Sequence, residues 1–169
     1  MRQHNGGDAQ LGEGATPLMR AAKVSNVNVM RMLLDKGADP NLRLRNGSTA
    51  VMIAAARSGR NLGPERLTID AIQLLIERGA DINAAGTSGD TALHVAIGRG
   101  DALVRFLVES GAKLDAVDKF GRTPLDVALG AAGGGGRGRG GRPAAPAPVR
   151  ESTAALLREL MDARGVAAR

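Results

Sequence analysis

The side chains in this sequence that could do chemistry are two histidines, His4 and His94, and a set of scattered carboxylates. The chain has no cysteine, and no second histidine stands near His94 in the sequence, so a metal ion would find too few ligands there. The acidic residues show no paired spacing of the kind that acid–base catalysis uses. Asp39 and Asp81 stand in Gly-Ala-Asp segments typical of turns. The sequence therefore predicts a protein that is not an enzyme, with no catalytic residue, cofactor or metal site.

A glycine–arginine run, GGGGRGRGGRP at residues 133–143, is the second candidate for chemistry. It resembles an RGG-type RNA-binding segment that would neutralise phosphates. Four arginines would supply the charge: Arg137, Arg139, Arg142 and Arg150. The run is brief, however, and has no aromatic side chain to stack on bases. It is not a phosphate loop, because no strand is expected before it and the chain contains no Gly-Lys-Ser or Gly-Lys-Thr. Nucleic-acid binding is the alternative, and a flexible insertion is the preferred interpretation.

Composition points to a globular protein that is poor in aromatic residues. Of 169 residues, 43% are hydrophobic, and Phe106 and Phe120 are the only aromatic side chains. Small aliphatic residues must therefore fill the core, which suits thin helices packed at close range. The net charge of +6 is uneven, since residues 1–129 hold 16 basic and 14 acidic residues and residues 130–169 hold 7 and 3. The N-terminus lacks a signal-peptide core and no 18-residue apolar run occurs, so we expect a cytoplasmic protein without a membrane span.

Two short sequence motifs recur along the chain and indicate its organisation. KGADPN begins at residue 36, RGADIN at 78 and SGAKLD at 110. Ahead of them stand ATPLMRAA, STAVMIAA, DTALHVAI and RTPLDVAL, whose threonines are Thr16, Thr49, Thr91 and Thr123. The interval from Thr49 to Thr91 is the longest, because it contains a nine-residue insertion, RNLGPERLT at 60–68. A period of about 33 residues predicts a row of repeated units instead of one wound core.

Each unit is predicted to be a pair of short helices followed by a turn. Threonine is a good N-cap, and Pro17 and Pro124 follow it at the first helical position, where no backbone N–H is needed. Alanine-rich stretches then predict a thin first helix. Aliphatic residues at helical spacing predict a second helix, which is closed by a left-handed residue at Gly37, Gly79 or Gly111.

The pattern D-x-x-G-x-T-P-L, Ala-Ala, Leu-Leu, G-A-D-x-N resembles the ankyrin repeat, and DKFGRTPL at 118–125 follows it almost letter for letter. The resemblance covers about residues 11–129, with a broken continuation at 151–165. It implies an all-α solenoid of stacked helix-turn-helix units with β-hairpin-like loops. It also implies that His94, at the family's histidine position, hydrogen-bonds to the neighbouring hairpin. Other residues take that position in the remaining units: Met19, Met52 and Asp126.

These patterns divide the chain into segments. We predict a disordered segment at 1–10, repeats at 11–43, 44–85 and 86–117, a capping repeat at 118–165 and a tail at 166–169. In the second repeat, which carries the insertion 60–68, Pro64 favours a longer second helix over about 65–78. The capping repeat carries a flexible Gly/Arg/Pro-rich insertion at 130–150. Its displaced second helix is then expected to stop at Gly165 and to present an apolar series: Ala155, Leu156, Leu160 and Met161.

The resemblance also implies a function, because the family binds proteins through the finger tips and the exposed side of the first helices. Twelve residues map to these places: Arg20, Lys23, Arg43, Arg45, Asn46, Arg57, Thr87, Ser88, Arg99, Lys119, Phe120 and Arg122. Eight of them are basic, which favours an acidic protein partner. We therefore predict a monomeric, non-catalytic protein-binding module. Besides nucleic-acid binding, a regulatory fragment of a larger multidomain protein is an alternative, since repeat 1 begins without a polar cap.

Overall fold

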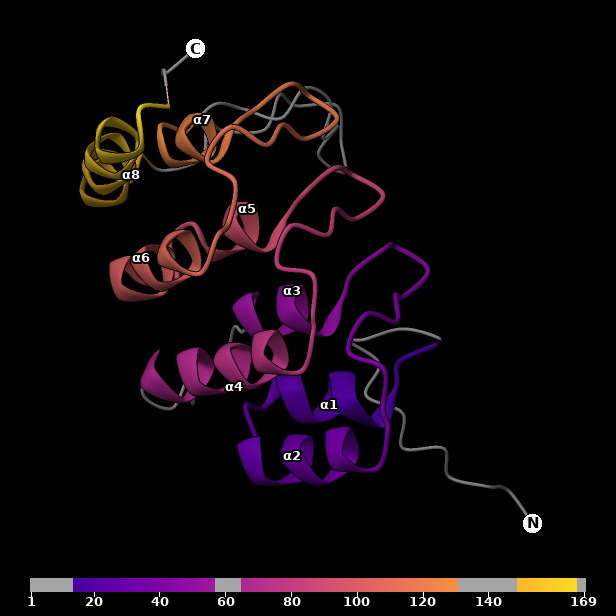
Figure 1. Ribbon diagram of the computed structural model, residues 1–169. Coiled ribbons are helices and arrows are strands. Elements are labelled where there is room, and N and C mark those ends of the chain that lie inside the picture. Colours follow the sequence, from indigo (N-terminus) through magenta and orange to yellow (C-terminus); the bar gives the residue numbers. More distant parts are fainter. Residues whose placement is uncertain (1–13, 57–64, 131–148, 167–169) are drawn as a thin grey trace.

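The computed structural model describes residues 14–56, 65–130 and 149–166, and Figure 1 shows these parts as a row of helix pairs. Within these ranges all regular structure is helical. The helices are α1 (Pro17–Lys23), α2 (Val27–Asp35), α3 (Ala50–Ala55), α4 (Glu65–Glu77), α5 (Ala92–Ala96), α6 (Asp101–Glu109), α7 (Pro124–Ala128) and α8 (Glu151–Arg164).

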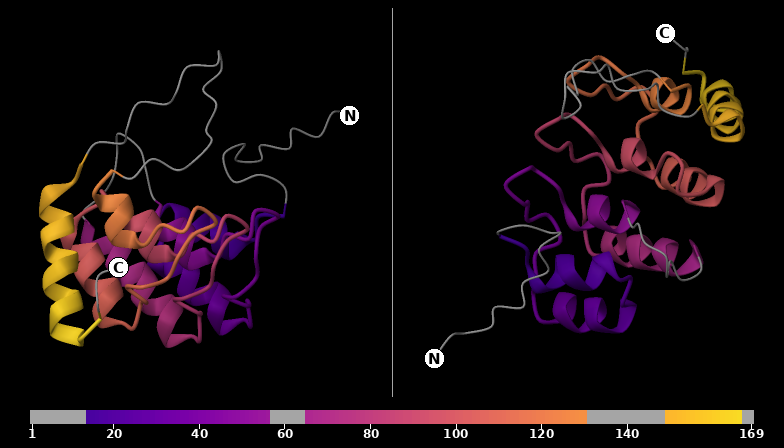
Figure 2. Two further views of the ribbon diagram at one scale, coloured as in Figure 1. Left: turned by 90° about the horizontal axis from the view of Figure 1, so that it is seen from above. Right: turned by 180° about the vertical axis from the view of Figure 1, so that it is seen from behind.

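The helix pairs stack in successive layers. In each pair the first helix (α1, α3, α5 or α7) lies beside the projecting loops, and the second helix (α2, α4, α6 or α8) lies on the outer side, as Figures 1 and 2 show. α3 packs between α1 and α5, and α4 packs between α2 and α6, so each pair contacts its immediate neighbours. This confirms the predicted solenoid, in which no helix pair buries its apolar side alone.

Small side chains let the inner helices approach closely. Ala22, Ala54, Ala96 and Ala128 have no exposed surface. Larger aliphatic residues from both helix layers, such as Leu93, fill the remaining space of one continuous apolar core. Full burial of one such side chain contributes roughly 1.5–3 kcal/mol. The scarcity of aromatic residues thus matches a core built from thin, closely packed helices.

The first helices begin as the threonine pattern predicts. The hydroxyls of Thr16, Thr49 and Thr123 accept hydrogen bonds from the backbone N–H three residues later, at 3.2, 3.4 and 3.2 Å. Pro17 and Pro124 occupy the start of α1 and α7, where no N–H is needed. The N-cap prediction for these three threonines and the proline prediction are therefore confirmed.

The second helices end at the recurring glycines. Gly37, Gly79 and Gly111 have φ of 85°, 84° and 99°, a left-handed conformation that costs glycine little. The longer helix expected in repeat 2 is also present, since α4 runs from Glu65 to Glu77 and has 13 residues, against nine in α2 and in α6. The part of the insertion before Glu65 lies outside the described residues.

The last helix completes the fourth unit. α8 packs against α6 and α7 and ends at Gly165, whose φ is 64°, as expected. Leu156, Leu160 and Met161 are buried as predicted, but Ala155 is exposed. The buried face also takes in Ala154 and Leu157, since these positions repeat with the helical period from Leu160. The Gly/Arg/Pro-rich segment 131–148 lies outside the described residues.

Candidate protein interface

The loops between helix pairs form three fingers, defined here as finger 1 (residues 37–48), finger 2 (79–90) and finger 3 (111–122). Each tip closes on itself through backbone hydrogen bonds. The N–H of Leu44 donates to the carbonyl of Ser48 at 2.9 Å, and finger 2 repeats this bond from Gly86 to Asp90 at 2.9 Å. In finger 3 the bond runs from Asp118 to Arg122 at 3.0 Å. Each tip is therefore a tight, hairpin-like turn.

Neighbouring finger tips are joined into a ladder. The N–H of Thr87 donates to the carbonyl of Asn46 at 2.9 Å, and the N–H of Lys119 donates to the carbonyl of Ser88 at 2.9 Å. The tips approach so closely that a Cβ on Gly47 would lie 2.7 Å from the Thr87 nitrogen. A side chain there would push the fingers apart, so the fingers form one connected surface.

The bases of the fingers are clamped by asparagine side chains. The Asn41 amide donates to the carbonyl of Gly79 at 2.9 Å, and its oxygen accepts from the N–H of Asp81 at 2.8 Å. Asn83 makes the same two bonds one repeat later, to Gly111 at 3.0 Å and from Lys113 at 2.9 Å. Each asparagine thus fixes the distance between two consecutive fingers.

Some predicted contact residues hold the fingers together. The Arg43 guanidinium donates to the carbonyl of Ala85 at 2.7 Å, so this side chain links finger 1 to finger 2. The Thr87 hydroxyl donates to the carbonyl of Asn46 at 3.0 Å, and the Ser88 hydroxyl bonds to the Asp90 carboxylate. These residues contribute to the shape of the surface through contacts within the protein.

Other predicted residues lie away from the finger tips. The fingers lead into the N-terminal ends of the inner helices, whereas Lys23 and Arg99 come at or after the C-terminal ends of α1 and α5. Arg20 is exposed in the second half of α1. Arg57 lies outside the described residues. Lys23 and Arg99 therefore lie at the end of the inner helices opposite to the fingers.

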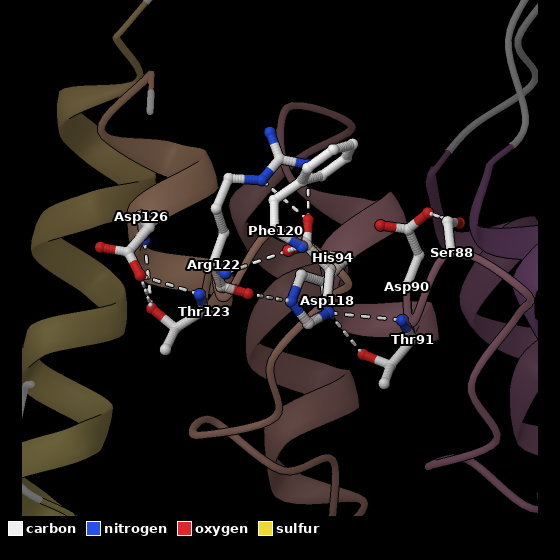
Figure 3. A network of polar contacts seen from close by, with 9 residues as sticks. All are labelled: Ser88, Asp90, Thr91, His94, Asp118, Phe120, Arg122, Thr123 and Asp126. Atoms are coloured by element: carbon white, nitrogen blue, oxygen red, sulfur yellow. Dashed lines mark hydrogen bonds and ion pairs between the residues drawn. The ribbon is translucent and has the colours of Figure 1, made fainter. Parts of the chain in front are cut away.

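The tip of finger 3 presents the aromatic ring of Phe120, which is 43% exposed. The Lys119 ammonium nitrogen and the Arg122 guanidinium carbon each lie 5.0 Å from the centre of this ring. Arg122 is itself held by Asp118, which accepts from its Nε at 2.7 Å and from its Nη2 at 2.5 Å. Figure 3 shows the ring beside the guanidinium, and dashed lines join the guanidinium to the Asp118 carboxylate. A buried carboxylate thus orients a cation, which in turn holds an exposed ring.

The environment of Asp118 favours its charged form. Its side chain has no exposed surface, and this burial raises the pKa of the carboxyl group. Hydrogen bonds from the Arg122 side chain and from the backbone N–H groups of Arg122 and Phe120, with the attraction of the guanidinium, outweigh that effect. The pKa of Asp118 is therefore lowered from its ordinary value of 3.8.

The predicted role of His94 is confirmed. This buried ring lies in α5, and its Nε2 is 3.0 Å from the carbonyl oxygen of Arg122 in finger 3. Its Nδ1 lies 2.9 Å from the Thr91 hydroxyl and 3.3 Å from the Thr91 nitrogen, as Figure 3 shows. His94 therefore connects the third repeat to the tip that carries Phe120.

The sequence interpretation missed three kinds of supporting residue. It named neither Asp118 as the anchor of Arg122 nor Asn41 and Asn83 as clamps. The recurrence of asparagine in the G-A-D-x-N motif was a signal from which the clamps could have been predicted. Glu65 was also missed, although its carboxylate accepts from the N–H of Leu103 at the start of α6 at 2.8 Å. No local pattern marks that last contact, because it joins two different repeats.

The described parts of the chain hold neither a candidate metal site nor a candidate membrane span. Among those residues, no group of three or more histidine or acidic side chains is placed to hold a metal ion. None of the described helices has the length and apolar character needed to cross a bilayer. The glycine–arginine run, the candidate for nucleic-acid binding, lies outside the described residues.

The stacked helix pairs and their ladder of fingers define the class of this protein, a helical solenoid that offers extended surfaces. A family model described as ankyrin repeats (3 copies) matches residues 2–85 and 64–133. The chain belongs to the ankyrin repeat family, whose repeats are generally protein–protein interaction modules.

Parts of three other ankyrin proteins are similar to this chain. It is 52% identical over 40 residues to an ankyrin repeat-containing protein of Treponema pallidum (strain Nichols), which covers 24% of this chain and 13% of that protein. It is 45% identical over 53 residues to the ankyrin repeat and KH domain-containing protein mask-1 of Caenorhabditis elegans, over 31% of this chain and 2% of that protein. It is 50% identical over 44 residues to the human fibronectin type 3 and ankyrin repeat domains protein 1. That alignment covers 25% of this chain and 13% of the human protein. The chain thus spans a small part of each relative.

Proposed function

We propose that this protein is a non-catalytic binding module that recognises a protein partner through its finger tips and the adjoining inner helices. The family to which it belongs supports the general role. The observation that carries the proposal is the tip of finger 3, where Phe120 is exposed and is held in place by Arg122 and Asp118. An aromatic side chain that is already oriented loses little conformational freedom on binding, which is typical of an interface anchor.

The charges around this ring favour an acidic partner. Lys119 beside it is exposed, and Arg45, the corresponding residue of finger 1, is exposed as well. Carboxylates on a partner would be attracted to these side chains, which raises the association rate and selects against basic surfaces. Arg43 and Arg122 are less suitable as direct contacts, because the first bonds to Ala85 and the second pairs with Asp118.

Affinity capture from a lysate of the source cells tests this proposal, with bound proteins quantified by mass spectrometry. The variant Phe120→Ala is expected to lower the recovery of specific partners at least tenfold, and Lys119→Glu with Arg45→Glu should also lower it. The matched control is Arg66→Glu on α4, where the side chain is 87% exposed and lies away from the fingers. Equal recovery from the wild type and the finger variants would show that the fingers do not bind the partner.

A further inference from the structure

The three finger tips differ in charge although they share one backbone shape. Each tip is defined here as the six residues before an N-cap threonine, so tip 1 is 43–48, tip 2 is 85–90 and tip 3 is 117–122. Tip 1 (RLRNGS) has two basic residues and no acidic one, tip 2 (AGTSGD) has one acidic residue and no basic one, and tip 3 (VDKFGR) has two basic residues and one acidic one. The net charges are therefore +2, −1 and +1, and their sign alternates along the row.

Asp90 supplies the negative charge of tip 2. Its side chain is half-buried and accepts a hydrogen bond from the Ser88 hydroxyl, which carries no charge. Among the described residues, no basic side chain forms an ion pair with Asp90. Figure 3 shows its carboxylate pointing to the same side as the Phe120 ring. A partner that contacts this ring therefore meets a carboxylate on the preceding finger.

Exposed cations stand on both sides of tip 2. Arg45 in tip 1 and Lys119 in tip 3 are exposed, and they are equivalent residues, because each lies four residues before its N-cap threonine. The equivalent residue of tip 2 is Thr87, which is uncharged and bonds to the carbonyl of Asn46. The middle finger thus lacks the cation that both of its neighbours present.

The ladder between the tips fixes the order and the spacing of these charges. Tip 2 is bonded to both neighbours, through the Thr87 N–H to tip 1 and through the Ser88 carbonyl to tip 3. The inner helices that follow the tips pack side by side, and packed helices lie about 8–10 Å apart, so the tips recur at a similar interval. The charges therefore form a row of about 20 Å whose sign reads positive, negative, positive.

A uniformly acidic ligand does not match this row. A nucleic acid carries one phosphate charge after another along its backbone, so one of these charges would face Asp90. Like charges that meet at a contact select against a partner. A protein segment can instead place a cation between two carboxylates, which gives each tip a charge of the opposite sign.

Given the protein-binding role proposed above, on which this step rests, we propose that the fingers bind an extended segment of a partner protein in which a lysine or arginine lies between two acidic residues. The basic side chain faces Asp90, and the acidic side chains face Arg45 and Lys119. An extended chain advances about 3.3 Å per residue, so three residues match the interval of about 10 Å between tips. The segment thus reads acidic-x-x-basic-x-x-acidic, a pattern that is the same in both chain directions.

Selection from a phage-displayed library of random peptides tests this charge order without knowledge of the partner. Among peptides that bind the wild-type chain, we expect about threefold enrichment of lysine and arginine at the central position and of acidic residues at both outer positions, as suits exposed ion pairs. Asp90→Lys should reverse the central preference from basic to acidic. Asp90→Asn keeps an acceptor for the Ser88 hydroxyl, and it should remove the central preference but leave the outer ones.

The matched control is Glu77→Lys, which changes the net charge by the same amount at an exposed residue of the outer helix α4. It should leave the selected pattern unchanged. If Glu77→Lys also reverses the central preference, net charge sets it and the proposal is wrong. The same central preference in the wild type and in Asp90→Lys would overturn the proposal as well.

Phe120→Ala separates this failure from failure of the proposed function. If Phe120→Ala abolishes selection but the peptides show no charge order, the fingers bind protein segments and only the charge order is wrong. If Phe120→Ala selects the same peptides as the wild type, the peptides bind elsewhere and both proposals are wrong. A wild type that selects no peptide contradicts the extended segment, and the lysate capture then decides the proposed function by itself.

Discussion

The Nε2 atom of His94 in repeat 3 lies 3.0 Å from the carbonyl oxygen of Arg122 in repeat 4, so this buried ring forms a polar link between two repeats. The carbonyl can only accept a hydrogen bond, so Nε2 carries the proton. The N–H of Thr91 can only donate, so Nδ1, at 3.3 Å, is the acceptor. The neutral ring with its proton on Nε2 therefore satisfies both repeats at once.

Replacing His94 by leucine should weaken this junction. The change places an apolar side chain in the core, leaves the Thr91 N–H without a partner, and leaves the Arg122 carbonyl with the Asp118 N–H as its remaining donor. Since a buried polar group without a hydrogen bond costs about 1–3 kcal/mol, we expect the free energy of unfolding to fall by about 2–3 kcal/mol. Equilibrium denaturation in urea measures this change.

The same replacement one repeat earlier is the control. Met52 occupies the position of His94 in repeat 2 and is buried, and among the described residues its side chain forms no hydrogen bond. Met52→Leu should cost less than about 1.5 kcal/mol, because it preserves volume and removes no polar link. Equal losses from the two leucine variants would mean that the His94 link contributes nothing beyond packing.

Acid should weaken the tip of finger 3 through Asp118. Because the pKa of Asp118 is lower in the folded protein than its ordinary value of 3.8, the unfolded chain takes up this proton first as the pH falls. The stability that Asp118 contributes is thus fully present above about pH 4 and is lost as the pH falls through the lower, folded-state pKa. Denaturation in urea at several pH values between 6 and 2.5 measures this loss of stability.

The variant Asp118→Asn isolates this contribution. It cannot ionise, so its stability should lie about 1–3 kcal/mol below that of the wild type near neutral pH, and the gap should narrow below pH 4. Other carboxylates titrate in both proteins and cancel in the comparison. A gap that stays constant down to pH 2.5 would show that the ionised form of Asp118 is not what stabilises the finger.

The repeats were predictable from the sequence because their signals are local. Thr16 is followed by Pro17, and Gly37 closes the helix before it, so neighbouring residues alone indicate where helices start and stop. The candidate site was less predictable. Arg43 and Lys119 are both basic residues of finger tips, yet Arg43 binds a backbone carbonyl in the next finger. That difference depends on the distance between stacked repeats, which no short segment encodes.

Removing the side chain at the clamp position should lower stability more at Asn83 than at Asp115. Asn83 bonds to Gly111 and Lys113, so Asn83→Ala removes two hydrogen bonds between fingers 2 and 3 and should cost about 1–2 kcal/mol. Asp115 is the corresponding residue of repeat 3 and is exposed, and it has no side-chain hydrogen bond among the described residues. Asp115→Ala should therefore change stability by less than about 0.5 kcal/mol. Thermal unfolding of the two alanine variants compares them, and similar losses would rule out the clamp.

Glu65 connects the lengthened helix of repeat 2 to the start of α6. The N-cap of α6 is Gly100, which has no side chain to cap the helix, and the Glu65 carboxylate takes that place by accepting from the N–H of Leu103 at 2.8 Å. A Cβ on Gly100 would overlap this carboxylate, so a glycine at this position leaves room for the Glu65 side chain. The extra turn of α4 thus stabilises repeat 3 from outside it.

Glu65→Ala should therefore cost about 1 kcal/mol, the usual contribution of a helix cap, and should speed amide exchange at the start of α6. Hydrogen exchange at Leu103 is expected to become about fivefold faster, since about 1 kcal/mol corresponds to that factor in an opening equilibrium. Arg66→Ala is the control, because that side chain is 87% exposed and next in sequence. If Leu103 exchanges equally in both variants, Glu65 does not cap α6, and the longer α4 has no role in the neighbouring repeat.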